Sequence, residues 1–222
     1  AGTAAFTNVS GLTTFYSNNT YTGGTFVNEG TLTASGSGTF GASTNVLSIS
    51  NTGTVDLGTT TQSVGALTMN GGNLTNGNLN ATTFTLTSGA NLISGTMSNT
   101  SGYTINGGTN TIQGTNNNGN NVYAINGGVN LISALLTGSN GLTASGGTTT
   151  LTNNNTYTGA NLVNSNATLI TALAGALGNS TNALSLSNTG TVNLDGTTQT
   201  VGALTMNGGN LTNGNLNATT FT

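Results

Sequence analysis

The sequence contains no Lys, Arg, His, Cys, Pro or Trp. Without Lys or Arg the chain has no cation that could neutralise phosphates or dock on an anionic lipid surface, so we expect neither nucleic-acid binding nor direct membrane insertion. The absence of Cys excludes disulfides and zinc–thiolate sites. No apolar run approaches the roughly 18 residues that span a bilayer, and the first residues lack the cationic region of a signal peptide.

Charge of either sign is scarce. Apart from the tyrosines, the only ionisable side chains are Glu29, Asp56 and Asp195, and the formal net charge is −3. Hydrophobic residues make up 33% of the 222 residues, and Thr, Asn and Gly together form more than half of the chain. Globular enzymes do not have this composition, which favours one elongated stack of small units instead.

The chain repeats itself over a long distance. Val64–Thr85 and Val201–Thr222 are identical, and the motif NTYTG of Asn19–Gly23 recurs at Asn155–Gly159. We therefore divide the chain into a first long unit, residues 1–136, and a partial second unit, residues 137–222. A shorter repeat runs through their boundary, so we expect one continuous structure over residues 1–222.

The shorter repeat has about 20 residues. It is clearest where YTINGG begins at Tyr103 and YAINGG begins at Tyr123. Extending this register along the chain gives one apolar anchor per repeat, at a spacing that varies only slightly. The predicted anchors of an inner core ladder are Phe6, Phe26, Leu47, Leu67, Phe84, Tyr103, Tyr123, Leu142, Leu162, Leu184 and Leu204.

Each anchor begins a predicted strand. The residue two positions later is apolar in most repeats, and a Thr or Ser usually stands between them, which is the period-two pattern of a half-buried strand. An Asn-Gly-Gly corner and a second short strand follow, and glycine can supply the positive φ of a tight corner. The predicted corner glycines are Gly71, Gly72, Gly107, Gly108, Gly127, Gly128, Gly208 and Gly209. Only Thr171–Leu177 is rich enough in Ala and Leu to form a helical turn.

A single repeat cannot bury its own inner face, because ordering a residue costs about 1–2 kcal/mol and a hydrogen bond returns about 1 kcal/mol net. Stacking the repeats at about 4.8 Å gives every strand two neighbours and lets corner asparagines bond along the stack. The predicted fold is all-β: a single-stranded parallel β-helix, or β-solenoid, of about 20 residues per coil and about 11 coils. Right-handed winding is favoured, because parallel crossover connections prefer that hand.

The inventory of side chains argues against an enzyme. Glycan-cleaving chemistry on a β-helix needs paired carboxylates, a cation or a metal cluster, and a serine nucleophile needs a base. Asp56 aligns with Asn193 in the second unit, Asp195 aligns with Gly58, and Glu29 aligns with Ser165, so no acid recurs. We predict structural or solvated acids, no catalytic residue and no cofactor. The Gly-Gly pairs lack the Asp of calcium-binding solenoid repeats, so we predict no metal site.

Asn19–Leu32, NTYTGGTFVNEGTL, resembles the passenger-associated β-strand repeat of autotransporter proteins and related giant bacterial adhesins, and Asn155–Leu169 repeats it loosely. The resemblance implies a long β-helix on the surface of a Gram-negative bacterium, serving as a stalk or adhesive filament. The chain departs from that family in lacking a C-terminal membrane-barrel segment and a charged passenger subdomain. The predicted function is a structural repeat region of an extracellular filament or giant surface adhesin.

Two alternatives remain open. Threonine-rich β-solenoids can bind ice, and the outward position after the anchor is often Thr, but the next outward position is mainly Ser or Asn. A carbohydrate-binding adhesin module is the other alternative, with Tyr21 and Tyr157 as stacking platforms for a carbohydrate or surface ligand. Because both long units place Tyr at the same point, we favour a packing role for these rings.

The expected partner is another coil of the same kind. The coil Leu204–Thr222 duplicates Leu67–Thr85, which is followed by a further coil in the first unit. Neither end carries the Lys, Pro or polar cap that usually protects an open solenoid edge. We therefore expect either covalent continuation into more repeats or head-to-tail self-association by β-augmentation.

Overall fold

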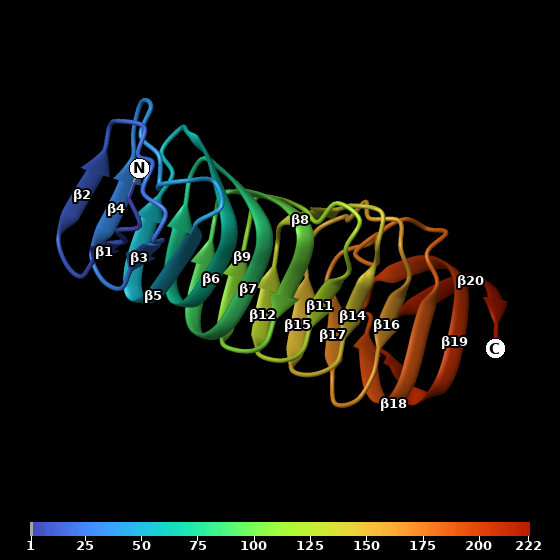
Figure 1. Ribbon diagram of the computed structural model, residues 1–222. Coiled ribbons are helices and arrows are strands. Elements are labelled where there is room, and N and C mark those ends of the chain that lie inside the picture. The colour runs from blue at the N-terminus through green and yellow to red at the C-terminus, as the bar shows by residue number, and fades with distance from the viewer. Residues whose placement is uncertain (1) are drawn as a thin grey trace.

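The computed structural model describes residues 2–222, which form a parallel β-solenoid of about 11 turns with a spacing of about 19 residues (Figure 1). The coils follow one another along a single axis, and the two ends of the chain lie at opposite ends of the stack. Between residues 2 and 222 there is no helix. The Ala- and Leu-rich stretch forms a turn at residues 174–177.

Residues 2–222 form 20 strands. Their bounds are β1 Phe6–Asn8, β2 Leu12–Phe15, β3 Thr25–Val27, β4 Thr31–Ala34, β5 Val46–Asp56, β6 Thr61–Thr75, β7 Asn78–Ile93, β8 Thr96–Ile105, β9 Thr109–Ile112, β10 Thr115–Asn117, β11 Tyr123–Ile125, β12 Val129–Ile132, β13 Leu135–Thr137, β14 Leu142–Ala144, β15 Thr148–Leu151, β16 Asn161–Val163, β17 Thr168–Thr171, β18 Leu184–Asn193, β19 Thr198–Thr212 and β20 Asn215–Phe221.

Strands on successive coils pair in parallel and in register. Tyr103 pairs with Tyr123 on the next coil, and Tyr123 pairs with Leu142 on the coil after that. In the three-residue strands β3, β11, β14 and β16 the middle residue points outward while its two neighbours point inward, as period two requires. The long strands β6, β7 and β19 continue round a corner, so one strand can contribute to two faces of the coil.

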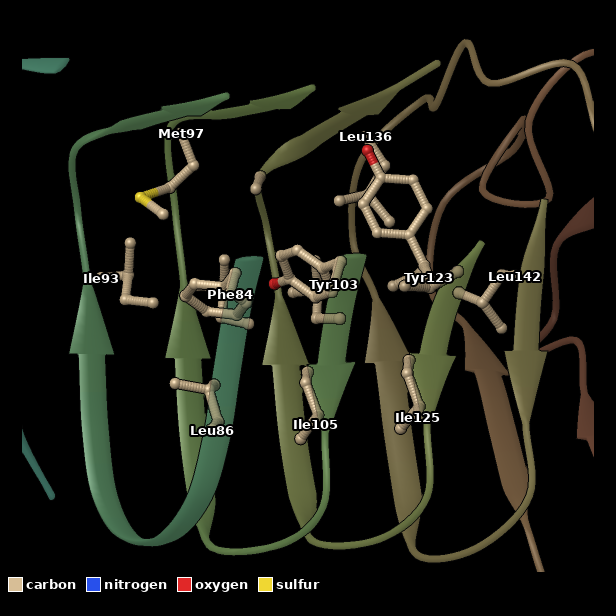
Figure 2. Close-up of a cluster of buried hydrophobic side chains, with 14 of the residues drawn as sticks. Phe84, Leu86, Ile93, Met97, Tyr103, Ile105, Tyr123, Ile125, Leu136 and Leu142 are labelled. Carbon is tan, nitrogen blue, oxygen red and sulfur yellow. The ribbon is translucent and has the colours of Figure 1, made fainter. Parts of the chain in front are cut away.

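The buried apolar side chains form one contiguous core that runs from Val27 to Leu204. Aromatic rings follow one another along it: Phe84 and Tyr103 stack with centroids 4.4 Å apart, and Tyr103 meets Tyr123 edge to face at 5.1 Å (Figure 2). Phe6 is half-buried against this core. The buried anchors are Leu47, Leu67, Phe84, Tyr103, Tyr123, Leu142, Leu184 and Leu204.

Two of the predicted anchors are wrong. Thr25, not Phe26, pairs with Leu47, and Asn161, not Leu162, pairs with Leu142. Phe26 and Leu162 therefore point outward and are half-buried. The prediction assumed that the inward residue of every coil is apolar. These two coils instead place a polar residue in the core, and the hydroxyl of a nearby tyrosine forms a hydrogen bond with it.

The Asn-Gly-Gly corners need glycine for two different reasons. Gly72 has a φ of 93° and Gly108 a φ of 86°, a region that residues with a side chain rarely adopt. The prediction of positive φ is wrong for Gly107 and Gly127, which do not have it. A Cβ at Gly127 would lie 2.7 Å from the carbonyl oxygen of Asn106 on the coil before, so close stacking selects glycine there.

Candidate functional site

The Asp56 carboxylate closes a turn. Asp56 Oδ1 accepts hydrogen bonds of 2.8 Å from the Gly58 amide and from Asn76 Nδ2. In the second unit Asn193 Oδ1 accepts the equivalent bond from the Asp195 amide, at 2.9 Å. Either Asp or Asn can close this turn, which explains why no acid needs to recur. Among residues 2–222 no three His, Cys, Asp or Glu side chains come together as metal ligands.

The tyrosines of the two NTYTG motifs are packing residues. Tyr157 is completely buried, and its hydroxyl donates a hydrogen bond of 2.7 Å to Asn161 Oδ1. Tyr21, which is half-buried, shares a bond of 2.6 Å with Thr25 Oγ1. These bonds satisfy the two polar anchors that the sequence analysis missed, and the four-residue spacing from Tyr was the signal that could have identified them.

A column of buried asparagines runs along one inner corner. Asn91 Nδ2 donates to Asn110 Oδ1 at 2.7 Å, and Asn110 Nδ2 donates to Asn130 Oδ1 at 2.6 Å. Each Nδ2 also donates to the backbone carbonyl oxygen three residues earlier in the same coil, and this bond stabilises the corner. Bonds from coil to coil were expected of the corner asparagines, and this column holds three coils in register.

Not every interior amide has such a partner. Asn116 is 1% exposed and stacks between Met97 and Leu136. Its side-chain amide makes no hydrogen bond of good geometry with the described residues, although it lies beside the Tyr103 hydroxyl, which is also buried without such a bond. A buried amide in this state costs about 1–3 kcal/mol. Asn116 therefore weakens the stack locally, in contrast to the asparagine column.

Two polar depressions occur at equivalent places in the two long units. The first, of about 420 Å³, opens between Asn18, Thr20, Ser43, Thr61 and Ser63. The second, of about 350 Å³, is formed by the equivalent positions of the second unit, among them Asn154, Thr156, Ser180, Thr198 and Thr200. No charged or aromatic residue lines either of them. We call these the corner depressions.

Each corner depression has a rigid floor. Gly41 and Gly178 have φ values of 81° and 78°, and a Cβ at either would lie 2.8 Å from the ring of Tyr21 or Tyr157. Asn45 Nδ2 donates to the Tyr21 carbonyl oxygen at 2.8 Å, and Asn182 Nδ2 donates to that of Tyr157 at 3.0 Å. The NTYTG tyrosines therefore fix the loop that forms the floor.

The outer faces are neutral but differ in chemistry. The outward column that follows the anchors is interrupted by Phe26 and Leu162, so it is not a threonine array. A second face, on β9, β12, β15 and β17, was not considered in the sequence analysis. There, two outward columns stand side by side: one holds Thr109, Val129, Thr148 and Thr168, and the other holds Thr111, Leu131, Thr150 and Ile170.

Within residues 2–222, the first and last coils each have a neighbouring coil on one side only. Among the described strands β20 pairs with β19 alone, and Phe221 on β20 is 74% exposed. Its identical counterpart in the first unit, Phe84, is completely buried because Tyr103 stacks on it. At the other end, the first coil exposes Val9, Leu12 and Tyr16. Both end coils therefore carry apolar side chains beside unpaired strand edges.

Comparisons with known proteins found no match. No family model, no curated protein and no solved structure matches the chain. No helix within residues 2–222 is long and apolar enough to cross a membrane.

Proposed function

We propose that this chain is a structural shaft: a repeat region of an extracellular filament or giant surface adhesin, in which coils stack end to end into a stiff fibre. The recurrence of an interior coil carries this proposal. Phe221 lies in a segment identical to the one that contains Phe84. In the first unit the next coil stacks on that segment and covers Phe84. A surface of this kind is suited to contact with another coil, and a contact between opposite ends repeats without closing.

The composition supports the same role. A shaft needs neither acids nor bases, and the chain has no cation and only three carboxylates. Its strength lies in ladders of backbone bonds, stacked rings and asparagines that continue from coil to coil. The resemblance of Asn19–Leu32 to autotransporter and adhesin repeats supports placement at the surface of a Gram-negative bacterium.

Sedimentation velocity over a range of concentrations tests end-to-end association. We expect the purified chain to form a concentration-dependent ladder of oligomers, and Phe221→Asp to abolish it by placing a charge on the open coil. Asn217→Asp is the matched control, because the equivalent Asn80 is exposed even where a coil is stacked above it. A chain that stays monomeric at all concentrations, or equal effects of the two variants, would contradict the proposal.

Ice binding is the second candidate, and the paired threonines on β9 and β15 favour it. Residues two apart on a strand and one coil apart along the stack form a regular grid, with a repeat of about 4.8 Å along the axis. Thr109 with Thr111, and Thr148 with Thr150, each occupy one row of this grid. Thermal hysteresis at micromolar protein, lost in Thr148→Lys, would support this candidate, and no hysteresis would exclude it.

A further inference from the structure

The corner depressions have the features of a ligand site that the long repeat duplicates. Their volumes of about 420 and 350 Å³ lie at the lower end of the range for small-molecule sites. Each extends over three successive coils, for example Thr20, Ser43 and Thr61 in the first unit, which is about 10 Å along the axis. A short segment of a chain-like ligand fits this shape better than a compact molecule that needs enclosure.

The lining indicates the chemistry of the ligand. Thr20, Ser43, Thr61 and Ser63 are exposed hydroxyls, each able to donate and to accept a hydrogen bond, and Asn18 adds a carboxamide with both capacities. With no charged residue in the lining, nothing there pairs with an anionic or cationic group. A neutral polyhydroxylated chain offers the same mixture of donors and acceptors.

We propose that each corner depression binds a segment of a neutral glycan. The two sites lie seven coils apart, or about 34 Å along the axis. A long glycan that reaches both sites would gain avidity, because the second contact is intramolecular. This deepens the proposed function by giving the shaft an adhesive face, but each site is formed within one long unit, so binding is measurable whether or not the chain associates end to end.

Isothermal titration with maltotetraose, cellotetraose and chitotetraose tests the proposal, with a heparin tetrasaccharide as the anionic comparison. We expect at least one neutral oligosaccharide to bind with a stoichiometry of two per chain. Ser43→Trp, which fills the first depression, should reduce the stoichiometry to one, and adding Ser180→Trp should abolish binding. Thr109→Trp places the same ring on an exposed position of another face and should leave the stoichiometry at two.

A second pair of variants guards against misfolding. Thr61→Ala and Thr198→Ala remove exposed hydroxyls from the two depressions without adding bulk, and together they should weaken binding at least tenfold while the circular dichroism spectrum stays unchanged. The proposal is overturned if none of the neutral oligosaccharides binds at millimolar concentration, if the double Trp variant binds as well as the parent, or if the heparin fragment binds more tightly than every neutral one.

Discussion

The Tyr157 hydroxyl donates a hydrogen bond of 2.7 Å to Asn161 Oδ1 inside the core, and Asn161 Nδ2 donates in turn to the Leu177 carbonyl oxygen at 2.9 Å. The two bonds let a coil place asparagine where its neighbours place leucine. Tyr157→Phe should lower the free energy of unfolding by about 1–3 kcal/mol, because it leaves Asn161 Oδ1 buried and unpaired. Tyr16→Phe, at a tyrosine that is 69% exposed, is the control and should change it by less than about 0.5 kcal/mol. Urea denaturation measures both, and equal effects would contradict this role of the hydroxyl.

Asn110 and Asn116 are both buried asparagines, and they should respond in opposite directions to the same substitution. Asn110→Leu removes the hydrogen bonds to Asn91 and Asn130 and leaves polar atoms of both side chains buried without these partners. We expect the free energy of unfolding to fall by about 2–4 kcal/mol. Asn116→Leu replaces an unpaired amide with an apolar side chain between Met97 and Leu136, so we expect a gain of about 1 kcal/mol. Thermal denaturation followed by circular dichroism compares the two variants. A loss of stability in both variants would show that the Asn116 amide bonds to the neighbouring Tyr103 hydroxyl.

Glycine at the corners should be essential only where both φ and close stacking require it. A Cβ at Gly108 would lie 2.5 Å from the Gly89 carbonyl oxygen, and its φ of 86° already disfavours a side chain. Gly108→Ala should therefore cost at least about 2 kcal/mol. Gly102 has no atom near such a Cβ and no positive φ, so Gly102→Ala should be neutral or slightly stabilising. A comparison of melting temperatures tests the contrast, which fails if Gly102→Ala is the more harmful change.

Alkali, and not acid, should unfold this chain. Burial raises the pKa of Tyr103, Tyr123 and Tyr157, so the folded chain keeps phenolic protons that the unfolded chain releases above about pH 10. This contribution to stability is complete below that pH and is lost as the pH rises further. The chain contains no histidine and only three carboxylates. The melting temperature should stay nearly constant from about pH 3 to 9 and then fall steeply. Unfolding near pH 4 with stability at pH 11 would contradict this account.

Much of the fold was predictable, because each coil repeats the same period-two strand at a nearly constant spacing. The anchors Tyr103 and Tyr123 were correctly placed on this basis, and the asparagine contacts followed from stacking alone. The errors at Phe26 and Leu162 arose because, in these two coils, the most hydrophobic residue is not the one that occupies the inward register position. A hydrogen bond from a tyrosine four residues earlier makes Thr25 and Asn161 acceptable in the core, and composition does not reveal such a bond.

The corner depressions were beyond the reach of the sequence analysis for a different reason. Their walls come from three coils, so residues such as Thr20, Ser43 and Thr61 become neighbours only once the loop between β4 and β5 is placed. The NTYTG motif pointed to this region, but its tyrosine does not line the depression. The tyrosine packs beneath the loop that forms the floor. Periodicity locates strands well, whereas the shape of a loop between them depends on bonds such as that from Asn45 to Tyr21.

Electron microscopy of the concentrated native protein tests the central claim most directly. An end-to-end shaft predicts unbranched filaments one solenoid wide, with successive chains coaxial and a coil repeat of about 4.8 Å along the filament axis. Phe221→Asp should reduce these filaments to single rods of about 50 Å. Discrete single rods in the parent protein at high concentration would contradict the claim.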